Sequence, residues 1–425
     1  MIVDVDPHAR AASRATYIAF IGSGVVMASW ASRIPQIRDG LGLAPSRLGL
    51  VLLAIAAGSI VALLMSGQLV TRFGSRRVVI AMAGLMGFAF VIVAIGYRIG
   101  VLPVVVGLIF FGFSIGAWDV AMNVQGTVVE RHLGRAIMPR FHAGFSVGTV
   151  AGALIGAAAV AVHLPVTAHL IAAALVVAAL VIISVRGFVD DSSADALPGH
   201  VSTDDAPVNL TDNLTGAEPN GFRRALATWR EPRTLLIGVF VLAFAFTEGA
   251  GIDWINVAMI DDYGAPASVG ALAFATFLAT MTVGRWFGPA LLDRYGRVPV
   301  VRALAVTSLV GLALFVFGPN TTVAFAGALL WGLGASLGFP VGMSAAADDP
   351  AKAAARVSVV ASIAYTAFLG GPPLIGFLGD HFTVLKGLIA VAVLLGVAIT
   401  FAGAIKPLSR ERAVSRDSSP SALNP

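Results

Sequence analysis

The stretch LVTRFGSRR, residues 69–77, recurs 222 residues later as LLDRYGRVP, residues 291–299. Leucine, arginine and glycine occupy the first, fourth and sixth positions in both copies, and each copy directly follows a long apolar run. A motif that repeats within one chain indicates a repeated structural unit. With only two copies at this spacing, the chain is predicted to consist of two homologous halves.

Further landmarks repeat at nearly the same spacing. They are Trp30 with Trp254, Gly112 with Gly334 and Gly116 with Gly338, at offsets of 224, 222 and 222 residues. Because these residues lie in different apolar runs, the repeat extends well beyond the basic loops.

The composition is typical of a membrane protein. Hydrophobic residues make up 57% and charged residues 12% of the chain, and the mean hydropathy is +0.88. Soluble domains are about a quarter charged. Apolar runs of the roughly 20 residues needed to cross a bilayer occur twelve times. They cover residues 15–37, 48–70, 78–98, 102–125, 141–163, 166–185, 234–258, 269–292, 299–318, 321–346, 357–379 and 384–405.

We therefore predict an all-α membrane protein with twelve transmembrane helices in two pseudo-symmetric six-helix halves. The expected parts are an N-terminal tail (1–14), a six-helix bundle (15–186), a largely disordered linker (187–232), a second six-helix bundle (233–405) and a C-terminal tail (406–425).

The basic residues predict the orientation. If both termini and the linker are cytoplasmic, the outer loops contain only Arg38, Arg47, Arg98 and Lys386. This bias follows the positive-inside rule, and it predicts a multi-pass protein of a bacterial cytoplasmic membrane. The bias also accounts for the sequence pI of about 10.0, so we expect no nucleic acid partner.

Several function classes lack support in the sequence. The chain has no cysteine, which excludes thiol catalysis. It shows neither a phosphate-binding G-x-x-x-x-G-K-[ST] loop nor a cluster of metal-ligand residues. We therefore expect no enzymatic activity, no metal and no cofactor other than a proton as coupling ion. The expected partners are a small solute and the lipid bilayer, and we expect a monomer.

The stretch GAWDVAMNVQ, residues 116–125, places an acid inside an apolar run. If Glu130 marks the inner edge of this helix, Asp119 lies eleven residues deeper, or about 16 Å at 1.5 Å per residue. A charge at that depth is costly and normally faces a cavity. Gly112, Asp119 and Asn123 share one helical face, so we predict that Asp119 and Asn123 bind solute or proton.

A second set of candidates lies on the seventh segment. Its TEGAGIDW stretch places Glu248 near the middle of the membrane and Asp253 nearer the outer surface. Glu248 is the second candidate for the proton or solute site. Arg33, at the outer end of the first segment, is predicted either to pair with Asp253 as an outer gate or to reach the lipid head groups.

Aromatic side chains complete the predicted site, because rings bury the apolar faces of flat or cyclic solutes. The candidates are Trp30, Trp118, Trp254 and Tyr365. Tryptophan in membrane helices also anchors at the interface, and this alternative applies to Trp30 and Trp254. His142 is a candidate proton relay, with helix capping or a loop contact as the alternative.

Twelve helices, a central linker and the basic loops after helices 2 and 8 resemble the major facilitator superfamily, whose loop pattern is G-x-L-x-D-R-x-G-R-R. Thr71 replaces the aspartate in the first copy, and Pro289 replaces the first glycine in the second. The resemblance implies that these loops form cytoplasmic latches, with Glu130 as the acidic partner of the first; lipid anchoring is the alternative. The predicted latch residues, to which we also assign Arg285, are Arg72, Gly74, Arg76, Arg77, Glu130, Asp293, Arg294, Gly296 and Arg297.

The motifs WDVAMN (118–123), VVE (128–130) and FHAGFSVG (141–148) resemble the fucose and sugar proton symporter branch of that superfamily. The resemblance implies that Asp119 contributes to the sugar and proton site. Ala31 stands where that branch has a second protonatable acid in the first helix.

Three functions remain open at this point. The first is proton-coupled symport of a small polar, sugar-like solute by alternating access. The second is a proton-coupled antiporter that exports drugs or metabolites, with Asp119 and Glu248 as cation sites. The third is a membrane sensor or scaffold without transport activity.

Overall fold

The computed structural model describes residues 7–134, 137–191, 227–349 and 352–408. Within these ranges, all regular secondary structure is helical, and twelve helices are long and apolar enough to cross a membrane. The predicted fold class is confirmed. The central part of the predicted linker, residues 192–226, and most of both predicted tails lie outside the described residues.

The first half contains six spans. Its elements are α1 (Pro7–Ala31), α2 (Ile34–Leu41), α3 (Pro45–Phe73), α4 (Ser75–Gly96), α5 (Val101–Leu133), α6 (Met138–Ala161), α7 (Val166–Ser184) and η1 (Val185–Gly187). The first span consists of α1 and α2, which are separated by a turn at Ser32 and Arg33. Helix α1 begins at Pro7, inside the segment predicted as a tail.

The second half contains the other six spans. Its elements are α10 (Pro232–Asp261), α11 (Ala267–Tyr295), α12 (Arg297–Phe317), α13 (Thr321–Ala335), α14 (Gly338–Ala346), α15 (Ala353–His381), α16 (Val384–Gly387), α17 (Ile389–Phe401) and η4 (Ala402–Ile405). The tenth span joins α13 to α14, and the twelfth joins α16, α17 and η4.

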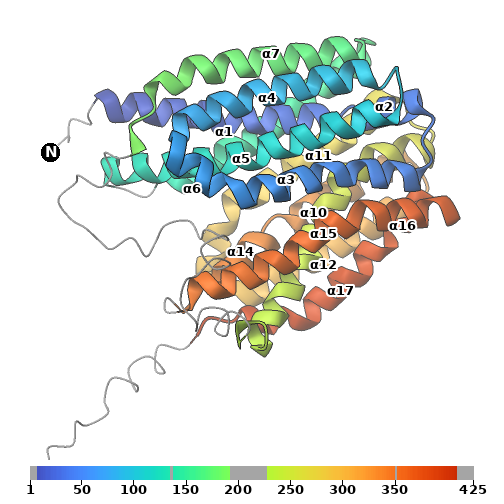
Figure 1. Cartoon of the computed structure of the whole chain (residues 1–425). Coiled ribbons are helices and arrows are strands. Elements are labelled where there is room, and N and C mark those ends of the chain that lie inside the picture. Colours follow the sequence, from blue (N-terminus) through green and yellow to red (C-terminus); the bar gives the residue numbers. More distant parts are fainter. Residues whose placement is uncertain (1–6, 135–136, 192–226, 350–351, 409–425) are drawn as a thin grey trace, which may run out of the picture.

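The two halves pack their helices in the same pattern. In the first half α1 packs on α6 and α7, while α5 packs on α3 and α4. In the second half α10 packs on α15 and α17, while α13 packs on α11 and α12. Figure 1 shows the blue-to-green helices grouped beside the yellow-to-red helices. Two contacts join the halves, α3 with α15 and α6 with α11, and they are equivalent under the pseudo-symmetry.

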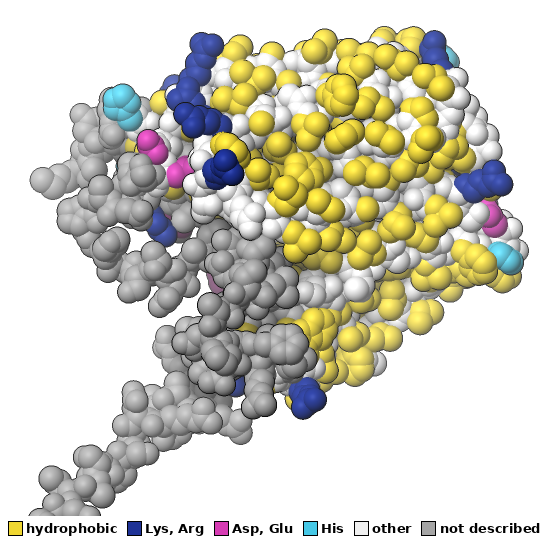
Figure 2. All heavy atoms as spheres, viewed as in Figure 1, with side chains coloured by type: hydrophobic (Ala, Val, Ile, Leu, Met, Phe, Trp, Pro, Cys, Tyr) yellow, Lys and Arg dark blue, Asp and Glu magenta, His cyan; other side chains and the backbone are white. Residues whose placement is uncertain are grey.

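Two ends of the bundle must be distinguished. We call the end where α3 and α7 finish and α10 begins the linker end. The opposite end, which carries α2 and the end of α10, is called the far end. Figure 2 shows charged side chains at both ends and a broad apolar surface between them. Exposed apolar side chains of this extent match the hydrocarbon core of a bilayer.

Glycines fix the distance between helices within each half. A Cβ atom on Gly112 of α5 would lie 2.0 Å from the Ile55 carbonyl oxygen of α3. A Cβ on Gly332 of α13 would lie 2.2 Å from the Phe277 carbonyl oxygen of α11. Small residues permit such close backbone approach. The packing partner of Gly112 is thus Gly332, 220 residues later, so the predicted match with Gly334 was wrong by two residues.

The basic loops occupy equivalent places in the two halves. Gly74, between α3 and α4, has φ +78°, and Gly296, between α11 and α12, has φ +83°. Side chains with a Cβ rarely adopt such φ values. These glycines therefore permit the sharp turn that reverses the chain at the linker end of each half.

The contact at Gly112 predicts the effect of a larger side chain. Gly112→Val would force a branched side chain against the backbone of α3, and overpacking of this kind costs about 1–3 kcal/mol. The matched control is Gly84→Val in α4, where a Cβ would meet no atom within 4 Å. Thermal unfolding in detergent should show a lower melting temperature for the first variant only; equal melting temperatures would contradict the packing described.

Candidate functional site

Asp119 lies near the middle of α5 with its side chain exposed, although protein surrounds it. A side chain that is both accessible and deep lines a hollow inside the molecule. Asn123, one turn further along the helix, donates from Nδ2 to the Asp119 backbone oxygen at 2.8 Å and to its Oδ1 at 3.3 Å. No cation pairs with Asp119 among the described residues.

The hollow lies between the halves. Tyr365, half-buried on α15 of the second half, is near enough to Asp119 for its hydroxyl to interact electrostatically with the carboxylate. The structure therefore brings together two predicted site residues from opposite halves, and it places Asp119 and Asn123 on the inward face of α5.

Glu248 forms an ion pair that the sequence analysis did not predict. Arg285 Nη2 donates to both carboxylate oxygens of Glu248 at 2.8 Å, and its Nε donates to the Ser336 backbone oxygen at 3.3 Å. The assignment of Arg285 to the cytoplasmic latch was therefore wrong. A clue was present: Arg285 precedes the end of α11 by ten residues, or about 15 Å at 1.5 Å per residue, and a charge at that depth requires a partner.

Asp253 lies five residues from Glu248 toward the far end. Its side chain is half-buried and surrounded by protein, and the described residues supply no hydrogen bond or ion pair to it. The second half therefore contributes one paired acid, Glu248, and one unpaired acid, Asp253.

The predicted gate between Arg33 and Asp253 is not formed. Arg33 is 2% exposed, and its Nε donates to His169 Nδ1 at 2.9 Å while its Nη2 donates to the Leu164 backbone oxygen at 3.0 Å. Both partners belong to the first half. Arg33 does not reach the head groups either, because its side chain is buried.

A different arginine closes the far end. Arg38 of α2 bonds both carboxylate oxygens of Asp261, at the end of α10, and its Nη2 also donates to Asp39 Oδ1 at 2.7 Å. Arg38 was placed among the outer-loop residues in the sequence analysis, so its role was missed. The amphipathic stretch IPQIRDGL of α2 was the available signal, since it returns a basic residue to the protein surface.

Other contacts across the far end support this closure. Asn256 Nδ2 of α10 donates to the Ser32 backbone oxygen at 3.2 Å, and the Ser46 backbone N–H donates to Asp380 Oδ1 at 3.2 Å. A Cβ on Gly49 of α3 would lie 2.3 Å from the Pro372 carbonyl oxygen of α15. The structure thus represents a state that is closed at the far end.

The predicted latch in the first half is also not formed in this state. Glu130 Oε2 accepts hydrogen bonds from the backbone N–H groups of Ile137 and Met138, at 2.6 and 2.8 Å. It therefore binds the start of α6 and no arginine. Arg72 lies over the Phe73 ring, and Arg76 and Arg77 are exposed.

The N-terminus of α4 receives its carboxylate from the linker. Asp191 Oδ2 accepts from the Ser75 backbone N–H at 2.5 Å, and its Oδ1 accepts from the Ser75 hydroxyl at 2.6 Å. A carboxylate at a helix N-terminus satisfies free N–H groups and complements the helix dipole. The first residues of the predicted linker are therefore docked on the bundle.

The second half has a different arrangement at the same end. Arg297, the first residue of α12, donates to Asp348 Oδ1 at 2.7 Å, while Asp293 and Arg294 are exposed. Glu231, just before α10, accepts from Arg356 at 2.7 Å and from Lys352 at 3.0 Å. The hydrogen bond from Arg356 lowers the pKa of Glu231 to about 2, so Glu231 is ionised at any physiological pH.

The remaining predicted residues do not all face the hollow. Trp30, Trp118 and Trp254 are buried in helix packing, so the structure does not place these rings on an accessible surface. His142 is exposed near the linker end of α6, with its ring against the edge of Phe20, and it lies within electrostatic range of Arg285 across the halves.

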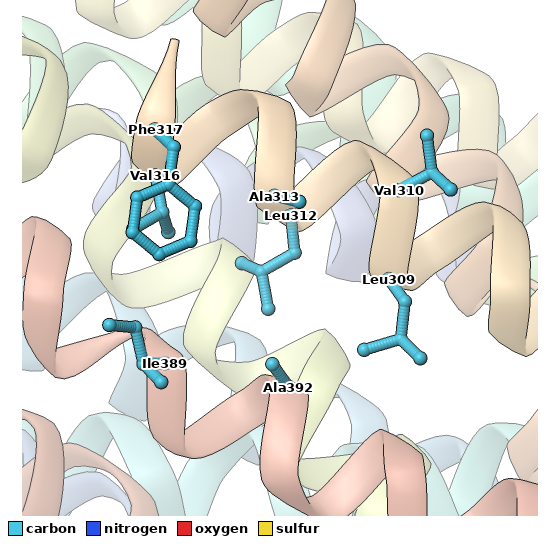
Figure 3. A pocket seen from close by; sticks show the side chains of 8 residues that line it. All are labelled: Leu309, Val310, Leu312, Ala313, Val316, Phe317, Ile389 and Ala392. Atoms are coloured by element: carbon cyan, nitrogen blue, oxygen red, sulfur yellow. The ribbon is translucent and has the colours of Figure 1, made fainter.

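A separate groove of about 320 Å³ lies between α12 and α17. Its lining is entirely apolar, and Figure 3 shows side chains such as Leu312, Phe317 and Ile389 around it. Phe317 and Ile389 are exposed on the apolar outer surface. The groove therefore faces lipid and offers no polar group to a solute.

Comparison with known proteins agrees with this architecture. A family model for the Major Facilitator Superfamily matches residues 15–348 and 248–422. The chain belongs to this superfamily. An uncharacterized transporter of Sinorhizobium fredii is 29% identical over 371 residues, which cover 87% of this chain and 92% of the relative.

Solved structures of the superfamily share the fold. A point mutant of the nucleoside transporter NupG has a TM-score of 0.72 at 12% identity, covering 94% of this chain and 98% of that one. A point mutant of the Escherichia coli fucose:proton symporter FucP has a TM-score of 0.61 at 14% identity, covering 93% and 98%. The predicted superfamily is confirmed, and the chain is a multi-pass membrane protein of a transporter family.

The far-end ion pair predicts a shift between conformational states. Arg38→Gln or Asp261→Asn should favour the state open at the far end by about 5- to 30-fold, which corresponds to one or two kcal/mol. The two changes should be non-additive in a double-mutant cycle. A cysteine introduced at the far end would report the shift by its labelling rate, because the chain has no native cysteine. Arg98→Gln is the control, and additive effects would contradict the pair.

The pair in the hollow predicts an effect on stability. Glu248→Gln leaves Arg285 without a counter-charge at mid-membrane depth, and we expect a loss of about 1–3 kcal/mol. Removing both charges with Glu248→Gln and Arg285→Gln should restore most of the melting temperature. Arg294→Gln, at an exposed position, serves as the control. A double variant less stable than Glu248→Gln would exclude this pairing.

Proposed function

We propose that this protein is a proton-coupled secondary transporter that moves a small polar, sugar-like solute by symport and alternating access. The observation that carries the proposal is Asp119, a carboxylate in the hollow between the halves with only an amide as partner. Orientation follows the positive-inside rule: the linker end faces the cytoplasm and the far end faces outward, in a bacterial inner membrane.

Asp119 is suited to carry the coupling proton. An ionised carboxylate is costly in a region of low dielectric unless it has a counter-charge, and none is paired with it. Binding a proton removes this cost, and accessibility allows the proton to enter and leave. Asn123 can stay hydrogen-bonded to either form, because an amide both donates and accepts.

Glu248 and Arg285 are suited to a different task. Each neutralises the other, so this pair can remain charged throughout the cycle without a bound proton. Charged donors and acceptors form strong hydrogen bonds, and both side chains are only partly buried. We assign to this pair the binding of solute hydroxyl groups, with Tyr365 as a further hydrogen-bonding group from α15.

Alternating access follows from the packing between the halves. The contacts of α3 with α15 and of α6 with α11 join the halves, while Arg38 and Asp261 hold the far end closed. Rocking of one half against the other would break that ion pair and open the hollow to the far side.

The comparisons support the choice of solute class. By their names, FucP carries fucose with protons and NupG carries nucleosides. Both solutes are small and polar. At 12–14% identity these structures share the fold alone, so the solute of this chain is inferred from the polar side chains in its hollow.

Export of cationic compounds by antiport is the second candidate. Asp119 and Asp253 come from opposite halves, and both carry a carboxylate without a paired cation. A cationic solute could exchange with protons at these two groups. Uptake driven by an inward proton gradient favours symport, whereas export driven by the same gradient favours antiport.

The role of Asp119 is tested by transport in reconstituted vesicles. An inward proton gradient should accelerate solute uptake, and Asp119→Asn should reduce this acceleration at least about tenfold, since the amide cannot release a proton. Asp293→Asn, an exposed acid outside the hollow, is the control. Proton-driven uptake that persists unchanged in Asp119→Asn would overturn the assignment.

A further inference from the structure

Arg33 carries a buried positive charge with no acid beside it. The side chain is 2% exposed, and its printed partners are His169 Nδ1 and the Leu164 backbone oxygen. Burying an arginine without a carboxylate is costly, so the two neutral acceptors must hold the guanidinium. The closer of the two, at 2.9 Å, is the histidine ring.

The hydrogen bond to His169 exists only while that ring is neutral. Arginine stays protonated in proteins and only donates. His169 Nδ1 must therefore offer its lone pair, which places the ring hydrogen on Nε2. A protonated ring has no acceptor, and it would place a second positive charge against the guanidinium. Protonation of His169 must break this contact.

The same turn of chain that holds Arg33 also forms the far-end closure. Arg33 lies between α1 and α2, and its backbone oxygen accepts from the Ile37 N–H in the first turn of α2. The adjacent Ser32 backbone oxygen accepts from Asn256 of the second half. Five residues further on, Arg38 bonds Asp261. A movement of Arg33 is thus transmitted to both contacts.

Few charged groups surround His169. The helices α1 and α4 and the short η1 pack against α7. From the end of α1 the facing charge is Arg33, and from the end of α4 the titratable group is Tyr97, which interacts electrostatically with Arg33. The charged residue of η1 is Arg186, at the linker end. No carboxylate from the described parts of these elements compensates a charge on His169.

We propose that His169 is a proton-sensitive lock on the far end. The neutral ring holds Arg33, and with it α2, in the position where Arg38 reaches Asp261. The protonated ring expels Arg33, loosens α2 and favours opening of the far end. This lock acts on the gate and not on the solute, so it operates whether or not Asp119 carries the coupling proton.

The test uses the natural lack of cysteine. Spin labels at Ile99→Cys and Phe317→Cys would sit on the far end of opposite halves, at positions that are 73% and 72% exposed. Electron-resonance distance distributions would be recorded at about pH 8 and about pH 4.5, on either side of the ordinary histidine pKa of about 6.5. We expect the ratio of open to closed far end to rise at least about threefold at the lower pH.

Three variants identify the group responsible. His169→Gln keeps a hydrogen-bond acceptor for Arg33 but does not titrate, so it should stay closed at both pH values. His163→Gln, an exposed histidine at the same end, should respond like the parent. Arg33→Gln should lose the response because no cation remains to be expelled, and it covers the case in which His169→Gln fails to fold.

Two results would overturn the proposal. One is an unchanged distance distribution in the parent across this pH range; the other is a full response in folded His169→Gln. Repeating the series with Asp119→Asn separates the lock from solute coupling, because the response should persist there while proton-driven uptake is lost. A response that disappears with Asp119→Asn but survives in His169→Gln would assign the effect to the hollow instead.

Discussion

The structure depends on the cost of placing a charge where the surroundings are hydrocarbon. A bilayer core supplies no water to solvate an ionised side chain, so each charge inside the helices needs a partner or a wet hollow. The protein uses several solutions: Glu248 and Arg285 neutralise each other, Arg33 relies on neutral acceptors, and Asp119 faces accessible space. The two halves share a fold while solving this problem differently. That difference, more than the symmetry, creates a polar route between the halves.

The sequence predicted the fold because length and hydropathy act on whole segments. Depth along a helix was equally predictable, since a fixed rise per residue placed Asp119 at mid-membrane. Pairing was not, because it depends on how each helix is rotated about its axis. Charge alone favoured Asp253 for Arg33, but the rotation of α1 directs Arg33 to His169. An acceptor without charge gives no signal in a count of acids and bases.

The repeat also had limited power. It correctly related the basic loops, where Gly74 and Gly296 both adopt positive φ values. It placed Gly112 opposite the wrong glycine, because two residues are lost between the halves before the tenth span and the pattern GxxxG tolerates such shifts. The lost acid at Thr71 likewise suggested a weakened loop. The structure supplies a carboxylate at the neighbouring helix start from Asp191, which lies too far along the chain for a motif to include it.

The far end is closed by two kinds of contact with different physical character. The ion pair between Arg38 and Asp261 is partly exposed, so dissolved salt screens it. The approach of Gly49 to Pro372 is backbone shape with no side chain between, and ions leave it unaffected. Ionic strength therefore acts on only part of the closure. A bacterium that meets changing salinity would retain a steric seal at this end even when the electrostatic one is weakened.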